Sequence, residues 1–220
     1  LRMKPGEKIR VCTRSGQNYF CSISDIAESF VRADILEKEA ESTELPCRIY
    51  LFQGLPKNDK MEWIIQKTVE LGVYEVIPVA MKNCVVKLDD KKAKSKVTRW
   101  QAIAESAAKQ SKRSLIPEVK MPMSYKEAVA YAKELDVKLV PYENEHGMAG
   151  TKAAMEQIKK GESIAVFIGP EGGFAPEEIA LVQDEMQLIS LGKRILRTET
   201  AGIAALAILG YQLESSDMIE

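Results

Sequence analysis

The sequence predicts an α/β protein whose main sheet is mostly parallel and is covered by helices on both faces. From Cys47 onward, short apolar segments of strand length alternate with longer segments of helical periodicity. This alternation is typical of parallel strands, because each crossover between them needs a connecting segment, usually a helix. The 220-residue chain is 45% hydrophobic and 29% charged, which suffices for a buried core and excludes an intrinsically disordered chain.

Residues 1–45 have a different pattern and are expected to form a separate small domain of short strands. The expected segments are a strand around Ile9 and Val11, a turn at 15–18, and strands at 19–23 and 30–36. Residues 37–45 are polar and acidic, as in a linker, so we place the boundary to the second domain, 46–220, after them. The first domain is small for an independent core, and the start at Leu1 in place of methionine predicts that further strands precede it.

Strands and helices are expected to alternate through the second domain. The strands are expected at 48–52, 73–79, 138–140, 163–168 and 188–191, where apolar residues cluster over short runs. The helices are expected at 59–71, 98–112, 124–135, 149–160, 176–186 and 200–213. The second helix is the clearest, because its apolar residues recur at helical spacing from Trp100 to Ala108. Gly72 is placed to end the first helix and Pro176 to start the fifth.

Charge, cysteine and histidine content exclude several classes of function. The net charge of -1 excludes a strongly basic nucleic-acid-binding tail protein, and the four cysteines contain no C-x-x-C pair, so no metal site is expected. His146 is the only histidine, which excludes chemistry that needs two histidines from one chain; we expect it to be a loop residue. No apolar run approaches the ~18 residues of a membrane span, and the N-terminus lacks a signal-peptide pattern. A cytoplasmic protein without a membrane partner is expected.

A glycine-rich loop follows the strand expected at 163–168. Gly169, Gly172 and Gly173 let backbone amides approach a ligand closely, and ligands of open α/β sheets bind at the carboxyl ends of the strands. The spacing fits neither a phosphate-binding loop nor a dinucleotide fingerprint. On these residues alone, a ligand-binding loop and an ordinary tight turn before a helix are equally open.

A polar segment with two arginines follows the last expected strand. Thr198 or Thr200 is suited to cap the next helix, and Glu199 suits the positive end of its dipole. Capping does not explain Arg194 or Arg197, because cations are unfavourable at a helix N-terminus. We therefore favour Arg197 as a residue that binds an anion or a developing oxyanion.

Positive charge is concentrated in one part of the chain. Residues 81–120 carry eleven lysines and arginines against four acidic residues, so this stretch is +7 and the remainder is -8. A basic stretch of this kind is typical of an RNA-binding face. A solvated, lysine-rich loop at 91–96 is the simpler interpretation of the charge alone.

Two long motifs in order resemble a known family. The motifs are GPEGGF at 169–174 and LGKRILRTETA at 191–201, supported by LRMKPG at 1–6, QKTVELG at 66–72, and the segment from Arg99-Trp100 to QSKR at 110–113. Together they resemble the bacterial 16S ribosomal RNA uridine-N3 methyltransferase (RsmE) family, and the resemblance spans essentially the whole chain. It implies a SPOUT-type fold with a trefoil knot in the C-terminal part of the sheet. It also implies an RNA-binding, PUA-like β-barrel at the N-terminus, of which this chain lacks the first strands.

The resemblance further implies methylation of uridine N3 in the 16S rRNA of the 30S subunit by a homodimer that uses S-adenosylmethionine. The cofactor-binding residues that it implies are Leu139, Pro141, Ile168, Gly169, Glu171, Gly172, Leu191, Gly192, Ile195, Leu196, Thr198 and Ala201. No metal is needed, because the sulfonium of the cofactor already activates the methyl group. Among catalytic residues, Arg197 is expected to stabilise the charge that spreads over the uracil carbonyls. Glu199 is the candidate proton acceptor, although helix capping competes for it. Arg113, Lys82 and Arg99 are the candidate RNA-binding residues.

The chain departs from the family pattern at three places, and two other interpretations remain open. Ala175 stands where the family usually has a serine or threonine helix cap, a loss of about 1 kcal/mol. Lys193 stands where proline is common, and residues 82–86 alter the usual Arg/Ser pattern. The open alternatives are another knotted RNA methyltransferase, acting on a ribose 2′-hydroxyl or another base, and a non-catalytic RNA-binding factor of ribosome assembly.

Overall fold

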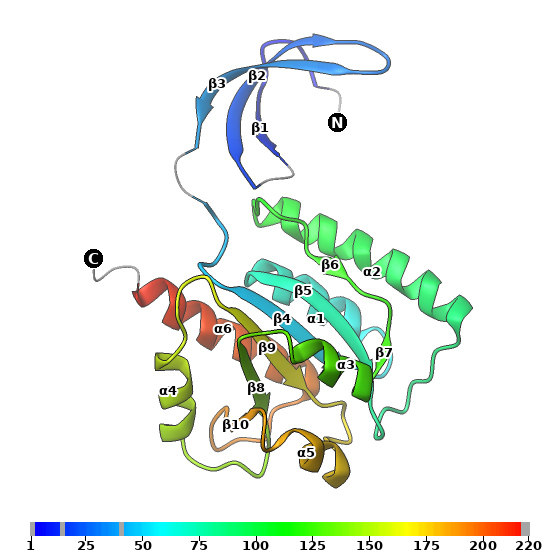
Figure 1. The fold of residues 1–220 in the computed structure, drawn as a ribbon. Helices are drawn as coiled ribbons and strands as arrows, with labels where there is room; N and C mark the ends of the chain where they lie inside the picture. The colour runs from blue at the N-terminus through cyan, green and yellow to red at the C-terminus, as the bar shows by residue number, and fades with distance from the viewer. Residues whose placement is uncertain (1–2, 14–15, 40–41, 217–220) are drawn as a thin grey trace.

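The chain forms two sheets in the computed structural model, which describes residues 3–13, 16–39 and 42–216 (Figure 1). The first sheet is antiparallel with the order β1-β2-β3, from strands β1 (Lys8–Cys12), β2 (Asn18–Ile26) and β3 (Val31–Lys38). The second has the order β10-β8-β9-β4-β5-β6, with β7 also paired to β5, and its ladders are parallel. Its strands are β4 (Arg48–Gly54), β5 (Val73–Ala80), β6 (Glu118–Val119), β7 (Met123–Ser124), β8 (Val137–Pro141), β9 (Ser163–Ile168) and β10 (Gln187–Ile189). The prediction of an α/β fold with a mostly parallel sheet is confirmed.

Helices cover both faces of the parallel sheet, with α3 and α5 on one face and α1 and α6 on the other (Figure 1). The helices are α1 (Lys60–Glu70), α2 (Asp90–Gln110), α3 (Tyr125–Ala132), α4 (Ala149–Glu156), α5 (Pro176–Val182) and α6 (Thr198–Ser216). Phe52 of β4 and Phe167 of β9 stack at a centroid distance of 4.3 Å, and Tyr131 of α3 packs edge-on against Phe52. The core therefore extends through the central strands, because both faces of β4 and β9 are buried.

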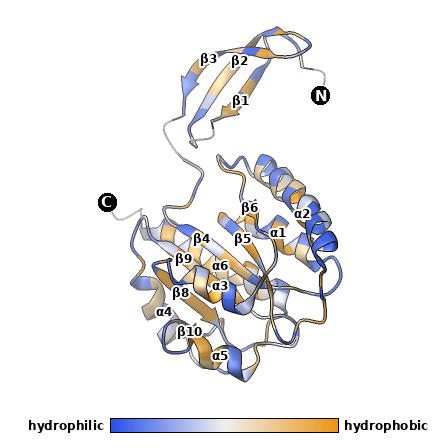
Figure 2. Cartoon of the chain, turned by 45° about the vertical axis from the view of Figure 1, so that its right-hand side comes forward, coloured by the Kyte–Doolittle hydropathy of each residue, from blue (hydrophilic) through white to orange (hydrophobic). Residues whose placement is uncertain are grey.

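Helix α2 begins eight residues before the start that the apolar periodicity predicts. Residues 91–96, expected as a lysine-rich loop, form its first turns, and Figure 2 shows hydrophilic residues along this helix. The Asp89 carboxylate caps the helix by accepting a hydrogen bond from the Lys92 amide at 2.8 Å. Ala93 and Trp100 turn inward while the lysines between them face solvent. The sequence shows no apolar periodicity in these first turns, because few of their residues are buried and the buried side chains are small.

The remaining differences lie at the ends of elements and in two very short strands. The helices expected at 149–160 and 176–186 end at Glu156 and Val182, whereas α6 begins at Thr198 and continues to Ser216. β6 and β7, each of two residues, have no counterpart in the prediction, because two residues carry no periodic pattern. In the first sheet, β3 continues to Lys38 and so takes up the start of the expected linker.

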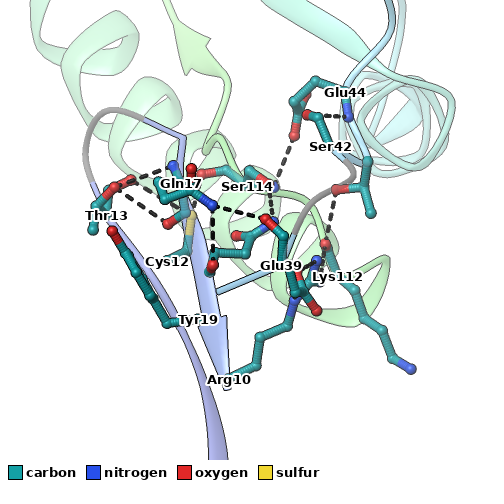
Figure 3. A network of polar contacts seen from close by, with 12 residues as sticks. Arg10, Cys12, Thr13, Gln17, Tyr19, Glu39, Ser42, Glu44, Lys112 and Ser114 are labelled. Atoms are coloured by element: carbon teal, nitrogen blue, oxygen red, sulfur yellow. Dashed lines mark hydrogen bonds and ion pairs between the residues drawn. The ribbon is translucent and has the colours of Figure 1, made fainter. Parts of the chain in front are cut away.

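The antiparallel sheet is attached to the loop that follows α2 (Figure 3). Lys112 in this loop has a positive φ of 57°, and its carbonyl accepts hydrogen bonds from Arg10 at 2.6 Å and Thr43 at 3.1 Å. The Cys12 thiol donates to the Ser114 carbonyl at 2.7 Å, and the Asn18 amide donates to the Ser114 hydroxyl at 2.6 Å. β1, β2 and the linker therefore all bond to one short loop of the second domain.

A buried ion pair lies directly beneath this attachment. The Arg113 side chain is 4% exposed and pairs with Glu44, which is 16% exposed. Arg113 also donates to the carbonyls of Val69 at 3.0 Å and Val73 at 2.6 Å. Glu44 accepts from the amide of Ser114 at 2.8 Å. The guanidinium thus bonds to protein groups and is buried, so it is not presented on the surface, where the predicted contact of Arg113 with RNA would need it.

Among the described residues, none of the helices combines the length and the apolar character that a bilayer-spanning segment requires.

Candidate functional site

The carboxyl ends of β8, β9 and β10 open into one cavity of about 620 Å³. This volume lies within the range of small-molecule sites, and the position matches the binding edge of parallel sheets. The predicted residues that line it are Pro141, Ile168, Gly169, Glu171, Leu191, Gly192, Ile195, Leu196, Arg197, Thr198 and Ala201. Leu139, Gly172 and Glu199 are not among the lining residues. Leu139 is fully buried within β8, Gly172 packs on Asn83, and Glu199 faces Lys60.

The glycine loop after β9 folds back on itself at the cavity wall. A Cβ at Gly169 would lie 3.2 Å from the ring of Phe174, and Gly173 has a φ of +67°. Asn83 holds the loop from outside by donating to the carbonyls of Gly172 at 3.0 Å and Gly173 at 3.2 Å. The loop is therefore both compact and fixed, as a site that presents backbone groups to a ligand requires.

Helix α5, which follows this loop, is capped by Glu178 in place of a side chain at Ala175. The Glu178 carboxylate accepts from the Ala175 amide at 2.8 Å and from the Lys82 amide at 2.8 Å. Ala175 itself has the extended backbone of an N-cap residue but no acceptor. Only one half of a capping box is therefore present.

Restoring the missing cap should stabilise the protein. We expect Ala175→Ser to raise the free energy of unfolding by about 0.5–1 kcal/mol, because a serine hydroxyl here can accept from the Glu178 amide. Urea unfolding followed by circular dichroism measures this change. Ala153→Ser, at an exposed position inside α4, is the control and should be neutral or slightly destabilising. A loss of stability in Ala175→Ser would mean that the buried site has no room for the hydroxyl.

The start of α6 is bound to the glycine loop. The Thr198 hydroxyl donates to the Gly169 carbonyl at 2.6 Å and accepts from the Gln53 amide at 2.9 Å. Thr198 therefore does not cap its own helix; it links β4, the glycine loop and α6. The amides of Thr200 and Ala201 donate to the carbonyl of Arg197 at 2.9 and 2.8 Å, which fixes the Arg197 backbone at the helix start.

Arg194, Ile195 and Arg197 lie exposed at the cavity. Arg194 and Arg197 both line it, and a Cβ at Gly192 would approach the Arg194 guanidinium at 4.0 Å. Ile195 is 85% exposed, an unusual position for a large apolar side chain. His146, expected as a loop residue, lines the cavity from the loop after β8.

Lys60, which the sequence did not indicate, joins two carboxylates beside the cavity. Its ammonium lies 3.0 Å from Glu171 and 3.2 Å from Glu199. The hydrogen bond to Glu171 raises the pKa of Lys60, outweighing burial. Burial raises the pKa of Glu171, but hydrogen bonds from Lys60 and the Lys57 amide outweigh it and leave that pKa below its usual value. The sequence signal that could have indicated Lys60 is its position shortly after the end of β4. In the sheet, β4 lies next to β9, which precedes the glycine loop.

The three candidate RNA-binding residues lie outside the cavity and are paired within the protein. Lys82 pairs with Glu177 on the surface, and the exposed Arg99 pairs with the largely buried Glu62. Arg113 is buried as described above. Much of the basic stretch is thus balanced by acidic side chains from other segments, which its charge count alone could not indicate.

The comparisons with known proteins identify the class. Residues 43–210 match the family model of the RNA methyltransferase domain. The ribosomal RNA small subunit methyltransferase E of Bacillus subtilis is 38% identical over 218 residues, which cover 97% of this chain and 85% of the relative. The corresponding protein of Synechocystis is 34% identical, covering 98% of this chain and 69% of the relative. The chain belongs to the family of ribosomal RNA small subunit methyltransferase E.

Solved structures agree in fold. A ribosomal RNA small subunit methyltransferase E from Neisseria gonorrhoeae, bound to S-adenosylmethionine, superposes with a TM-score of 0.79 at 33% identity, covering 96% of this chain and 85% of that one. A Legionella pneumophila protein in complex with the same cofactor gives a TM-score of 0.79 at 32% identity, covering 94% and 84%.

Proposed function

We propose that this protein transfers the methyl group of S-adenosylmethionine to N3 of a uridine in the 16S rRNA of the small ribosomal subunit, in the cytoplasm. One observation carries the proposal: the two sequence motifs meet in a single cavity at the carboxyl edge of the sheet. Family membership gives the class of reaction, and two similar proteins hold this cofactor in their structures.

The residues of the cavity fit this cofactor. Ile168, Leu191 and Leu196 offer apolar walls, and Gly192, with a φ of +110°, has no side chain between its backbone and the cavity. Glu171 and its neighbours supply polar groups at the rim. When bound, the cofactor supplies a methyl group that its sulfonium has already made electrophilic.

The protein's own residues must then bind the uracil and assist the loss of its proton. Its N3 proton lies between two carbonyls on the pairing edge, so the base must be unpaired to be reached. Loss of this proton spreads negative charge over O2 and O4. We assign Arg197 the stabilisation of that charge, because its guanidinium is exposed at the cavity while its backbone is held by α6. Glu199, two positions further along the chain, is our candidate to accept the proton.

The same proposal includes a role for the N-terminal domain and an oligomeric state. We assign residues 1–45 to a PUA-like RNA-binding domain and 46–220 to a methyltransferase domain with a C-terminal trefoil knot. We further propose a homodimer that acts on the 30S subunit. Large apolar side chains exposed at the cavity and on α6, Ile195 and Tyr211, support a surface that is covered in the assembly.

Incubation with 30S subunits that lack the modification tests the function. The subunits and labelled S-adenosylmethionine are mixed with the protein, and the methylated nucleoside is identified by mass spectrometry. 3-Methyluridine is the expected product. A 2′-O-methylated nucleoside or another methylated base would assign a different reaction to the same cavity. Binding to the subunit without binding of the cofactor would favour a non-catalytic assembly factor.

The contact between β4 and the glycine loop should control cofactor affinity. A Cβ at Gly54 would lie 2.7 Å from the backbone nitrogen of Pro170, so Gly54→Ala forces this loop away from β4. We expect a loss of about tenfold or more in S-adenosylmethionine affinity, measured by calorimetry, since a strain of about 1–3 kcal/mol is relieved by moving the loop. Gly150→Ala, which has open space around it, is the control. Unchanged affinity in Gly54→Ala would show that the loop adapts without affecting the cavity.

A further inference from the structure

Lys60 differs from the surface lysines of this protein because it joins three segments that are distant in sequence. It is the first residue of α1, and its ammonium contacts Glu171 of the glycine loop and Glu199 in the first turn of α6. Lys67, on the same helix and similarly exposed, pairs only locally with Glu70. Lys60 also lines the cavity, whereas Lys67 does not.

The two carboxylates depend on Lys60 to different degrees. Glu171 also accepts a hydrogen bond from the Lys57 amide at 3.0 Å, so it keeps a donor without Lys60. Glu199 has Lys60 as its one ion-pair partner within the described part of the chain. Both carboxylates lie within contact distance of one ammonium, so they are close enough to repel each other when it is removed.

We propose that Lys60 is a positioning residue for methyl transfer, acting through Glu199. Its ammonium holds this carboxylate, and with it the first turn of α6, against the cavity. The same turn fixes the backbone of Arg197 through the amides of Thr200 and Ala201. Without the ammonium, repulsion from Glu171 displaces Glu199 and shifts Arg197 from its place at the cavity. This inference rests on the function proposed above.

Three single variants separate positioning from a general loss of structure. We expect Lys60→Met to lower kcat about 10- to 100-fold, the scale of a misplaced catalytic group. Calorimetry without RNA should show a change of less than about threefold in the Kd of S-adenosylmethionine, because the Lys57 amide still holds Glu171. Lys60→Arg should recover most of kcat. Lys67→Met is the matched control and should match wild type in both measurements.

A double-mutant cycle tests the route through Glu199. If Lys60 acts through this carboxylate, the Lys60→Met/Glu199→Gln variant should be no slower than the slower single variant. Losses of kcat that multiply, or a Glu199→Gln protein with wild-type kcat, would overturn the proposal. A parallel loss of cofactor affinity and kcat in Lys60→Met would also overturn it, by making Lys60 a cofactor-binding residue.

A measurement without cofactor or RNA tests the contact itself. Carbon NMR of the glutamate carboxyl groups should show a higher pKa for Glu171 in Lys60→Met than in wild type, and no change in Lys67→Met. An unchanged Glu171 pKa would mean that the contact does not form in solution. Failure of the proposed function is distinct, because the wild-type protein itself would then transfer no methyl group to the subunit.

Discussion

Replacement of Arg197 with alanine should lower kcat for methyl transfer about 100- to 1,000-fold, the loss typical of removing one preorganised charge-stabilising donor. The loss should fall on kcat because the negative charge on the uracil oxygens develops only during the reaction. Cofactor affinity, measured by calorimetry without RNA, should stay close to wild type. The apolar walls and the glycine backbone that we assign to the cofactor are unchanged by this substitution.

Arg194→Ala is the matched control, since Arg194 lies on the same segment and is also exposed at the cavity. We expect it to lose much less activity, because its side chain lies toward Gly192 and not at the start of α6. Arg197→Lys should retain part of the activity, because it keeps the charge but loses the planar fork. A larger loss in Arg194→Ala would transfer the assignment to Arg194. An equal loss of cofactor affinity and kcat in Arg197→Ala would make Arg197 part of the cofactor site.

The fold was predictable from the sequence where hydrophobic patterns are long. The prediction failed where solvent-facing residues dominate. β9 begins and ends where the sequence predicts, because Ile164 to Ile168 form a continuous apolar run. The first turns of α2 were missed because lysines that face solvent carry no periodic signal, although the Asp89 cap was present in the sequence. The attachment of the first sheet to the loop at Lys112 joins residues that are about a hundred positions apart. No local pattern indicates such a contact.

The parts of the candidate site that directly follow a strand were predictable, because apolar strands can be recognised in the sequence. The glycine loop and the segment after β10 were found because each follows an apolar strand. Lys60 was missed because its role depends on the order of the strands, which brings the end of β4 beside the end of β9. Thr198 was one of two candidates for the helix cap, yet its hydroxyl bonds to Gly169 across a crossover connection. Sequence patterns therefore indicated the loops but not the bonds that hold them together.

Arg113 belongs to the basic stretch and yet is buried, and its replacement has the largest expected effect on stability. Arg113→Met should lower the free energy of unfolding by about 3–5 kcal/mol, because it leaves the buried Glu44 carboxylate without its guanidinium partner. Urea unfolding measures this loss. Lys133→Met, which breaks the surface pair with Glu185, is the matched control and should cost no more than about 1 kcal/mol.

The double variant Arg113→Met/Glu44→Gln distinguishes an unpaired charge from lost packing. If the buried carboxylate is the cause, removing its charge as well should recover a large part of the stability that Arg113→Met loses. Amide hydrogen exchange shows where the structure is weakened. In Arg113→Met, the protection of amides in β1 and β2 should fall, because Glu44 also holds the loop at Ser114 to which both strands bond. Stability that falls further in the double variant would instead assign the loss to packing of the Arg113 side chain. Exchange that rises only around Val69 and Val73 would mean that the pair supports the second domain and leaves the attachment of the first sheet unaffected.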